Sequence, residues 1–160
     1  RVTALAGERE IALNTLNDPH PYERHHAEDW IASHRGQFER RESVTYAVTL
    51  REDGALVGAV GLIVDASNEV AELGYWIGKP YWGRGYASEA ARAVVSWGFT
   101  ELGLHRVHAS HFPRNPASGA VLRRIGMRHE GRLREHVKKW GEHLDLERYG
   151  ILRREFETAG

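Results

Sequence analysis

Apolar and polar residues alternate along the second quarter of the chain. In residues 44–50, valine, tyrosine, valine and leucine occupy every second position, which is the period of a β-strand. Residues 56–64, although weakened by two glycines, and residues 69–77 are predicted as the next two strands. Turn residues at 52–54 and 65–68 separate the three segments. Three strands joined by two short turns predict an antiparallel meander.

Elsewhere the apolar residues follow a helical period. Residues 88–102 carry apolar side chains at helical spacing, and Gly103 follows as a stop signal. Residues 115–126 begin with an Asn-Pro helix start and end in glycine, which predicts a second helix. Residues 1–16 are loosely helical, and residues 23–38 form a polar helix with one apolar face.

Three further strands are predicted at 106–112, 128–137 and 143–152, the last two joined by a turn at a Trp-Gly pair. The order is therefore helical segments, three strands, helix, strand, helix and two strands. This order predicts a mixed α/β (α+β) fold in a single domain covering residues 1–160.

Composition excludes several classes of protein. The chain has 160 residues, of which 41% are hydrophobic and 28% charged, as in a globular domain. No apolar run approaches the roughly 20 residues that a membrane-spanning helix needs. Without cysteine there can be no disulfide, thiolate zinc site or cysteine nucleophile, and the composition fits a reducing cytoplasm. The chain opens at Arg1 without methionine, so the natural start is expected to lie upstream.

Charge and histidine spacing give no sign of nucleic-acid or metal binding. The 22 basic and 22 acidic residues cancel, so no global field attracts nucleic acid, and an arginine-rich RNA-binding module is disfavoured. Among the ten histidines, His25 and His26 would diverge on a helix. His105, His108 and His111 recur every third residue in a predicted strand and cannot share one face. No metal site is predicted.

The most informative segment joins the strand ending near residue 77 to the helix beginning near residue 88. Two glycines let the backbone turn sharply and approach a ligand closely. Unpaired N–H groups and the helix dipole make an anion site there, for which a pyrophosphate is a natural guest. The same glycines would also suit a tight connection with no ligand, because short glycine patterns are weak evidence. The donors would be the backbone amides of Gly83, Arg84, Gly85, Tyr86, Ala87 and Ser88.

Four segments in order resemble the GNAT N-acetyltransferases, and most of all their RimJ/RimL-type branch. Trp82–Ala87 resembles the acetyl-CoA loop Gln/Arg-x-x-Gly-x-Gly/Ala, with Trp82 in place of Gln or Arg. Glu72–Ile77 resembles the family's fourth strand, and Asn115–Ser118 its Asn-x-x-Ser helix start. Arg123–Met127 resembles the basic-x-Gly-Phe ending of that helix, with methionine in place of phenylalanine.

The resemblance implies a GNAT fold, in which helices flank a central mixed, mostly antiparallel sheet that is splayed at the acetyl-CoA strand. The family places one strand before its first helix. Because residues 1–16 already resemble that helix, we expect the chain to lack the first strand.

The resemblance also implies direct transfer of an acetyl group from acetyl-CoA to a primary amine within a ternary complex. The amides of the glycine loop would hold the pyrophosphate, and the backbone of Tyr75, Trp76 and Ile77 would pair with pantetheine. One amide, at Trp76 or Ile77, would polarise the thioester carbonyl.

Glu72 and Ser118 are the candidate catalytic residues. By strand alternation Glu72 shares a face with Gly74 and Trp76, and apolar surroundings would suit it as the base. Alternatively, Glu72 is an ordinary surface glutamate. The family places a hydroxyl at Ser118 near the CoA sulfur, although a serine here could simply bind helix N–H groups. Asn115 is expected to cap the helix, to contact pantetheine, or both.

The acceptor amine is open between a protein N-terminus and a small molecule. Candidate substrate contacts on the later strands are His111, Arg132, Arg134, Asp145 and Tyr149. A non-catalytic acetyl-CoA-binding regulatory domain is the alternative function, and the presence of both Glu72 and Ser118 argues against it. A homodimer is compatible with the sequence.

Overall fold

The computed structural model describes residues 1–15 and 17–159. Leu16, at the end of the first predicted helical segment, lies outside the described residues. The strands form one six-stranded sheet in the order β1-β2-β3-β4-β6-β5. All pairs are antiparallel except β3 with β4, so the sheet is mixed as predicted. The strands are β1 (Ser43–Thr49), β2 (Leu56–Asp65), β3 (Val70–Ile77), β4 (Arg106–His111), β5 (Arg128–Lys139) and β6 (Glu142–Leu152).

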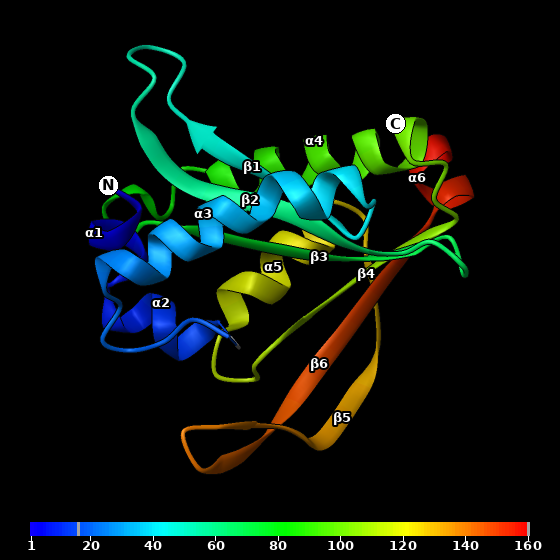
Figure 1. The fold of residues 1–160 in the computed structure, drawn as a ribbon. Helices are drawn as coiled ribbons and strands as arrows, with labels where there is room; N and C mark the ends of the chain where they lie inside the picture. The colour runs from blue at the N-terminus through cyan, green and yellow to red at the C-terminus, as the bar shows by residue number, and fades with distance from the viewer. Residues whose placement is uncertain (16, 160) are drawn as a thin grey trace.

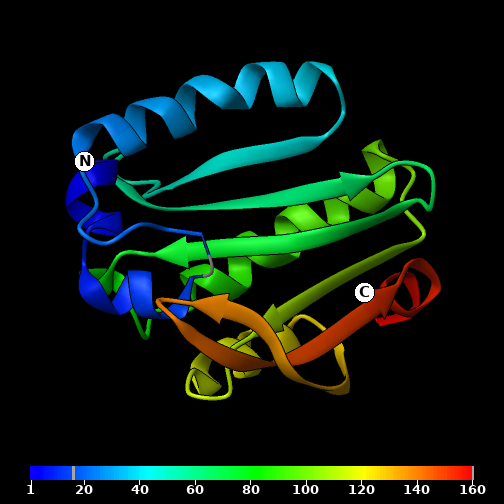
Figure 2. The ribbon, with the colours of Figure 1, turned by 60° about the horizontal axis from the view of Figure 1, so that its bottom comes forward.

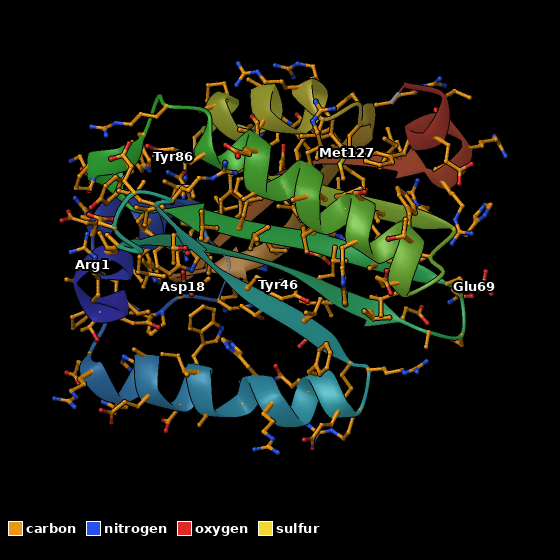
Figure 3. The ribbon with its side chains drawn as sticks, turned by 90° about the horizontal axis from the view of Figure 1, so that it is seen from above. Arg1, Asp18, Tyr46, Glu69, Tyr86 and Met127 are labelled. Atoms are coloured by element: carbon orange, nitrogen blue, oxygen red, sulfur yellow. The ribbon has the colours of Figure 1, made fainter. Side chains whose placement is uncertain are left out.

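Helices surround this sheet (Figure 1). The longest helices are α3, which packs along β1, and α4, which packs across β2 and β3. Figure 3 shows α4 lying over one face of the sheet, with Tyr86 at its N-terminal end. The helices are α1 (Val2–Ala6), α2 (Arg9–Asn14), α3 (Arg24–Glu39), α4 (Tyr86–Glu101), α5 (Pro116–Arg124) and α6 (Arg153–Ala159).

Three details of the helices differ from prediction. The first helical segment is broken into α1 and α2 at Gly7-Glu8. Helix α4 begins at Tyr86 rather than near Ser88, because Gly85 adopts the left-handed conformation directly before it. Helix α6 was not predicted, and the ring of its Phe156 packs 5.4 Å from that of Phe99 on α4.

The core lies between the sheet and helices α4 and α5. In each central strand every second side chain points toward these helices. The apolar face of α4 packs against those side chains. The contiguous buried cluster consists of Val44, Val60, Leu62, Ala71, Leu73, Ala91, Val94, Val95, Phe99, Leu104, Val107, Ala109, Leu122, Ile125, Met127, Tyr149 and Ile151.

Strands β3 and β4 pair over a short stretch and then separate. Three register pairs join them, and the last is Glu72 with His108. Beyond this rung β3 continues to Ile77 and β4 to His111 without pairing to each other. Figures 1 and 2 show the two strands diverging from a common edge. The predicted splay of the sheet is therefore present, and its apex is the Glu72–His108 rung.

Within residues 1–15 and 17–159, no helix combines the length and apolar character needed to cross a bilayer.

Candidate active site

The loop between β3 and α4 lies at the open end of the splay. Gly83 and Gly85 have φ values of +75° and +80°, which lie in the left-handed region that favours glycine. A Cβ atom added at either glycine would have no neighbouring atom within 4 Å. These glycines are therefore required by backbone conformation and leave the space in front of the loop open.

The backbone N–H groups of residues 83–88 form no hydrogen bond with any described residue. The first helical bond is donated by Glu89 to the carbonyl of Gly85, over 3.1 Å. Six successive donors therefore lie free at the N-terminus of α4, whose dipole favours an anion there. This arrangement suits the diphosphate of a coenzyme.

Two side chains hold the loop in place. The indole of Trp82 donates to the carbonyl of Ile77 over 2.6 Å, which fastens the loop to the end of β3. The departure from the Gln or Arg of the family motif thus has a structural role. The guanidinium of Arg124 donates to the hydroxyl of Ser88 over 3.3 Å, which links the first turn of α4 to the end of α5.

The backbone of β3 presents every second residue to the splay. The N–H of Gly78 donates to the carbonyl of Val57 on β2 over 2.7 Å. Because bonding alternates along an antiparallel pair, the backbone groups of Trp76 also point toward β2. The odd-numbered residues face β4 instead: the N–H of Leu73 closes the last β3–β4 pair by donating to the carbonyl of His108, and only the N–H groups of Tyr75 and Ile77 face the open splay. Trp76, which the sequence suggested as a cofactor-binding amide, therefore faces away from it.

On the helix side of the sheet, Tyr75 and Ser118 bridge the splay between β3 and α5. The phenol oxygen of Tyr75 lies 2.6 Å from Oγ of Ser118 and 3.4 Å from the Ser118 carbonyl oxygen. Burial raises the pKa of the Tyr75 phenol to about 12, although the hydrogen bond with Ser118 acts to lower it. Both hydroxyls are therefore protonated at neutral pH. The Ser118 hydroxyl is therefore hydrogen-bonded to Tyr75 and does not cap the N–H groups at the start of α5.

Asn115 precedes α5 but its side chain does not cap the helix. Its backbone N–H donates to Phe112, and its carbonyl accepts from Ser118. The carboxamide makes no hydrogen bond within the described part of the chain, so it remains available for a ligand at the splay.

Glu72 points to the opposite face of the sheet and is exposed. The apolar enclosure expected from strand alternation is absent, because Gly74 leaves open space and Trp76 packs toward Trp30, with ring centroids 6.4 Å apart. Its neighbour across the rung is His108. The two candidate catalytic residues, Glu72 and Ser118, thus lie on opposite sides of the splayed sheet.

Two of the expected substrate contacts are instead part of the core. His111 donates through Nδ1 to the carbonyl of Phe112 over 2.7 Å. The buried phenol of Tyr149 accepts a hydrogen bond from Arg123 over 2.9 Å. Their burial beneath α5 explains why they pack rather than project outward.

The remaining three expected contacts lie on the arm formed by β5 and β6. Arg132 and Asp145 form an ion pair of 2.8 Å and line a hollow of about 340 Å³ beside the end of β4. Arg134 is exposed. Among the residues that the structure describes, no three His, Asp or Glu side chains come together as a metal site.

Sequence reasoning missed two side chains at the splay. The phenol of Tyr75 was overlooked because only its backbone was considered, although alternation with Leu73 places it toward the helices. His108 was considered only as a metal ligand. Its place beside Glu72 depends on a parallel strand pairing that sequence periodicity does not contain.

Comparison with known proteins agrees with this geometry. Residues 2–128 match the family model of the acetyltransferase (GNAT) domain. The uncharacterised N-acetyltransferase p20 of Bacillus licheniformis is 34% identical over 112 residues, which is 69% of this chain and 63% of p20. The chain thus spans slightly less than two thirds of that relative. The [ribosomal protein uS5]-alanine N-acetyltransferase of Escherichia coli is 31% identical over 85 residues, or 51% of this chain and 44% of that protein.

A solved structure extends the likeness to nearly the whole chain. RimJ of Mycobacterium smegmatis, solved in complex with CoA-disulfide, is 25% identical and has a TM-score of 0.83, with 96% of this chain and 75% of RimJ covered. The free loop amides, the splayed strands and these matches lead to one conclusion: the chain belongs to the GNAT acetyltransferase family, whose members bind acetyl-CoA.

Proposed function

We propose that the protein is an N-acetyltransferase that transfers an acetyl group from acetyl-CoA to a primary amine by direct attack in a ternary complex. The observation that carries the proposal is the row of six free N–H groups at residues 83–88, placed at the open end of the splay. When bound, acetyl-CoA supplies an acetyl group activated as a thioester.

The loop amides would hold the diphosphate, and the Tyr75 and Ile77 backbone would pair with the pantetheine arm. Five residues of strand separate Ile77 from Glu72, which is roughly 16 Å at 3.3 Å per residue. An acyl group near Ile77 would therefore be far from the base. The N–H of Leu73 is used in the last pair with β4, so the first free N–H beyond the apex is that of Tyr75, and we assign it to the thioester carbonyl oxygen.

We assign the removal of the amine proton to the open face of the sheet and the stabilisation of the departing thiolate to the helix side. An attacking amine must lose a proton, because an α-amine has a pKa of about 8 and a lysine about 10.4. Glu72 would draw that proton away on the open face, directly or through an intervening group. Ser118 would donate a hydrogen bond to the departing thiolate on the helix side, and Tyr75 would donate to Ser118. This separation suits a nucleophile and a leaving group on opposite sides of one carbonyl carbon.

For the acceptor, we propose an α-amine with a carbonyl oxygen next to it, as at a peptide N-terminus or in a small amino compound. The Oγ atom of Ser110 and the Nε atom of Arg148 are enclosed and unpaired within the described residues. The two residues are register partners on β4 and β6, so their side chains share the face of Glu72. These two atoms are closed to a ligand, but the terminal nitrogens of Arg148 are neither enclosed nor hydrogen-bonded within the described residues. They would donate to a carbonyl oxygen, whereas a polyamine would meet the Arg148 charge.

The test is an amine panel with acetyl-CoA, in which release of free thiol is followed. The panel contains a peptide with a free N-terminal alanine, the same peptide blocked at its N-terminus but carrying a lysine, and spermidine. We expect the free N-terminus to react fastest, and Glu72→Gln and Ser118→Ala each to lower kcat/KM. Acetyl-CoA binding without thiol release from any amine would favour a regulatory domain instead.

A further inference from the structure

We infer that His108 is the group that takes the proton from the acceptor ammonium, and that Glu72 stabilises the imidazolium so formed. This inference rests on the proposed acetyltransferase function. In the step, an N–H bond of the ammonium breaks, its electron pair stays on the amine nitrogen, and the proton joins the imidazole. The imidazolium then returns the proton to water past the exposed carboxylate of Glu72.

The position of His108 is the first argument. It faces Glu72 across the last rung before β3 and β4 separate, and residues paired in register point to the same face. An imidazole and a carboxylate therefore stand side by side at the apex of the splay. The N–H of Tyr75, assigned to the thioester carbonyl, is the first free N–H of β3 beyond this pair. An amine that attacks there from the open face approaches on the side of the apex where the imidazole lies.

The hydrogen bonding of His108 is the second argument. Its Nδ1 atom is enclosed and has no hydrogen-bond partner among the described residues. Its Nε2 atom is not enclosed and also forms no hydrogen bond with any of them. No protein group therefore fixes its tautomer or occupies the nitrogen that must accept the proton. His111, three residues further along β4 and on the opposite face, differs because the carbonyl of Phe112 accepts from its Nδ1.

The charges around His108 are the third argument. Burial lowers the pKa of the imidazole from its ordinary value of 6.5, and Arg148 on β6 and Arg106 on β4 act in the same direction. Glu72 on β3 and Glu130 on β5 oppose them. The imidazole is therefore neutral at pH 7 and ready to accept a proton. Among the groups that raise the pKa of His108, Glu72 has the largest effect. This is expected of a carboxylate that stabilises a transient imidazolium.

The experiment is the pH dependence of kcat/KM for the parent, His108→Asn, His108→Gln and Glu72→Gln. The parent should show an acid limb with an inflection below pH 6.5. Both His108 variants should lose this inflection and fall roughly 100-fold or more at neutral pH, as for a removed general base. Glu72→Gln should keep the inflection but move it to lower pH. His105→Asn, which changes an exposed histidine outside the rung, should leave the profile unchanged.

Three outcomes overturn the inference. An inflection that survives in the His108 variants but disappears in Glu72→Gln would make Glu72 the sole base. An NMR titration in which the His108 ring protonates at or above pH 6.5 would remove the neutral base, whether or not turnover is seen. A parent that releases no thiol with any amine would overturn the proposed function together with the inference. Retained acetyl-CoA binding in His108→Gln would show that a lost inflection is not a loss of folding.

Discussion

Gly85 shows how a single residue can carry a site through its backbone alone. Gly85→Ala puts a Cβ atom on a residue at φ +80°, which costs roughly 1–2 kcal/mol of folding stability. No protein atom would be touched, but the methyl group would enter the open space where the diphosphate is expected. We expect calorimetry to show at least a tenfold loss of CoA affinity in this variant.

Gly54→Ala is the matched control for Gly85→Ala. Gly54 has φ +71° in the β1–β2 turn, and a Cβ atom there also meets nothing within 4 Å. Urea denaturation should give similar losses of stability for the two variants, while only Gly85→Ala should lose CoA affinity. Equal affinities would show that the loop does not bind the diphosphate.

Tyr75 has a predictable effect on stability at high pH. Its pKa is raised to about 12 in the folded protein, against 10 when unfolded. Between these values the unfolded chain releases the phenol proton and the folded chain keeps it. The stability that Tyr75 contributes is therefore complete below pH 10 and is lost as the pH rises toward 12, by at most about 3 kcal/mol.

Urea unfolding of the parent and of Tyr75→Phe at pH 8.5 and 11.5 tests this effect. The variant should be less stable by about 1 kcal/mol at pH 8.5, because Ser118 loses its hydrogen-bond partner. The difference should shrink or reverse at pH 11.5. A difference that is constant with pH would mean that the phenol titrates normally.

Among the elements, α5 is held at an unusually close distance from β4 and β6. A Cβ atom on Gly119 would lie 2.7 Å from Nε2 of His111 and 3.1 Å from the phenol oxygen of Tyr149. Both rings are buried and cannot swing away. Gly119→Ala should therefore push α5 outward and destabilise the fold by about 1–3 kcal/mol, despite the better helix propensity of alanine. Thermal unfolding measures this loss.

Gly36→Ala makes the same change in α3, where the atoms nearest to the new Cβ would be those at the far end of the long Arg40 side chain. It should stabilise the protein by up to about 1 kcal/mol. Because α5 carries Ser118, Gly119→Ala should also lower kcat, and Gly36→Ala should not. Stabilisation by both substitutions would contradict the close packing of α5.

The helices and strands were largely predictable from the sequence, but the contacts between elements distant in the sequence were not. Period-two alternation and turns rich in Gly, Pro, Asp or Asn located all the predicted strands, because both signals are local in sequence. Helix α6 was missed because a short helix held by contacts such as Phe156 with Phe99 has little local signal. The meeting of Glu72 with His108, and of Tyr75 with Ser118, depends on strand pairing and helix docking between distant segments.

For the whole molecule, the coenzyme-binding loop could be located from the sequence because its donors are backbone amides and glycines mark their position. The proton-transfer groups are ordinary side chains that no sequence pattern marks. Ser118 came from resemblance to a family, and Glu72 from its position on the strand that resembles the family's fourth strand. His108 and the Tyr75 phenol could be assigned to the site only from the three-dimensional arrangement of β3, β4 and α5. A net charge of zero also means that an anionic coenzyme must be attracted locally, at the loop, rather than by the molecule as a whole.

Coenzyme binding should therefore stabilise the entire domain through this loop. A ligand at 100 times its dissociation constant adds about 2.7 kcal/mol to the folded state. For a chain of this size that corresponds to a rise in Tm of roughly 5–10 °C. We expect differential scanning fluorimetry with CoA to show this rise for the parent and for Gly54→Ala, and little or none for Gly85→Ala. Because the affinity comes from neutral amides beside one helix end, moderate salt should reduce the rise only slightly. A rise that persists in Gly85→Ala, or that disappears at 200 mM salt, would place the coenzyme elsewhere on the molecule.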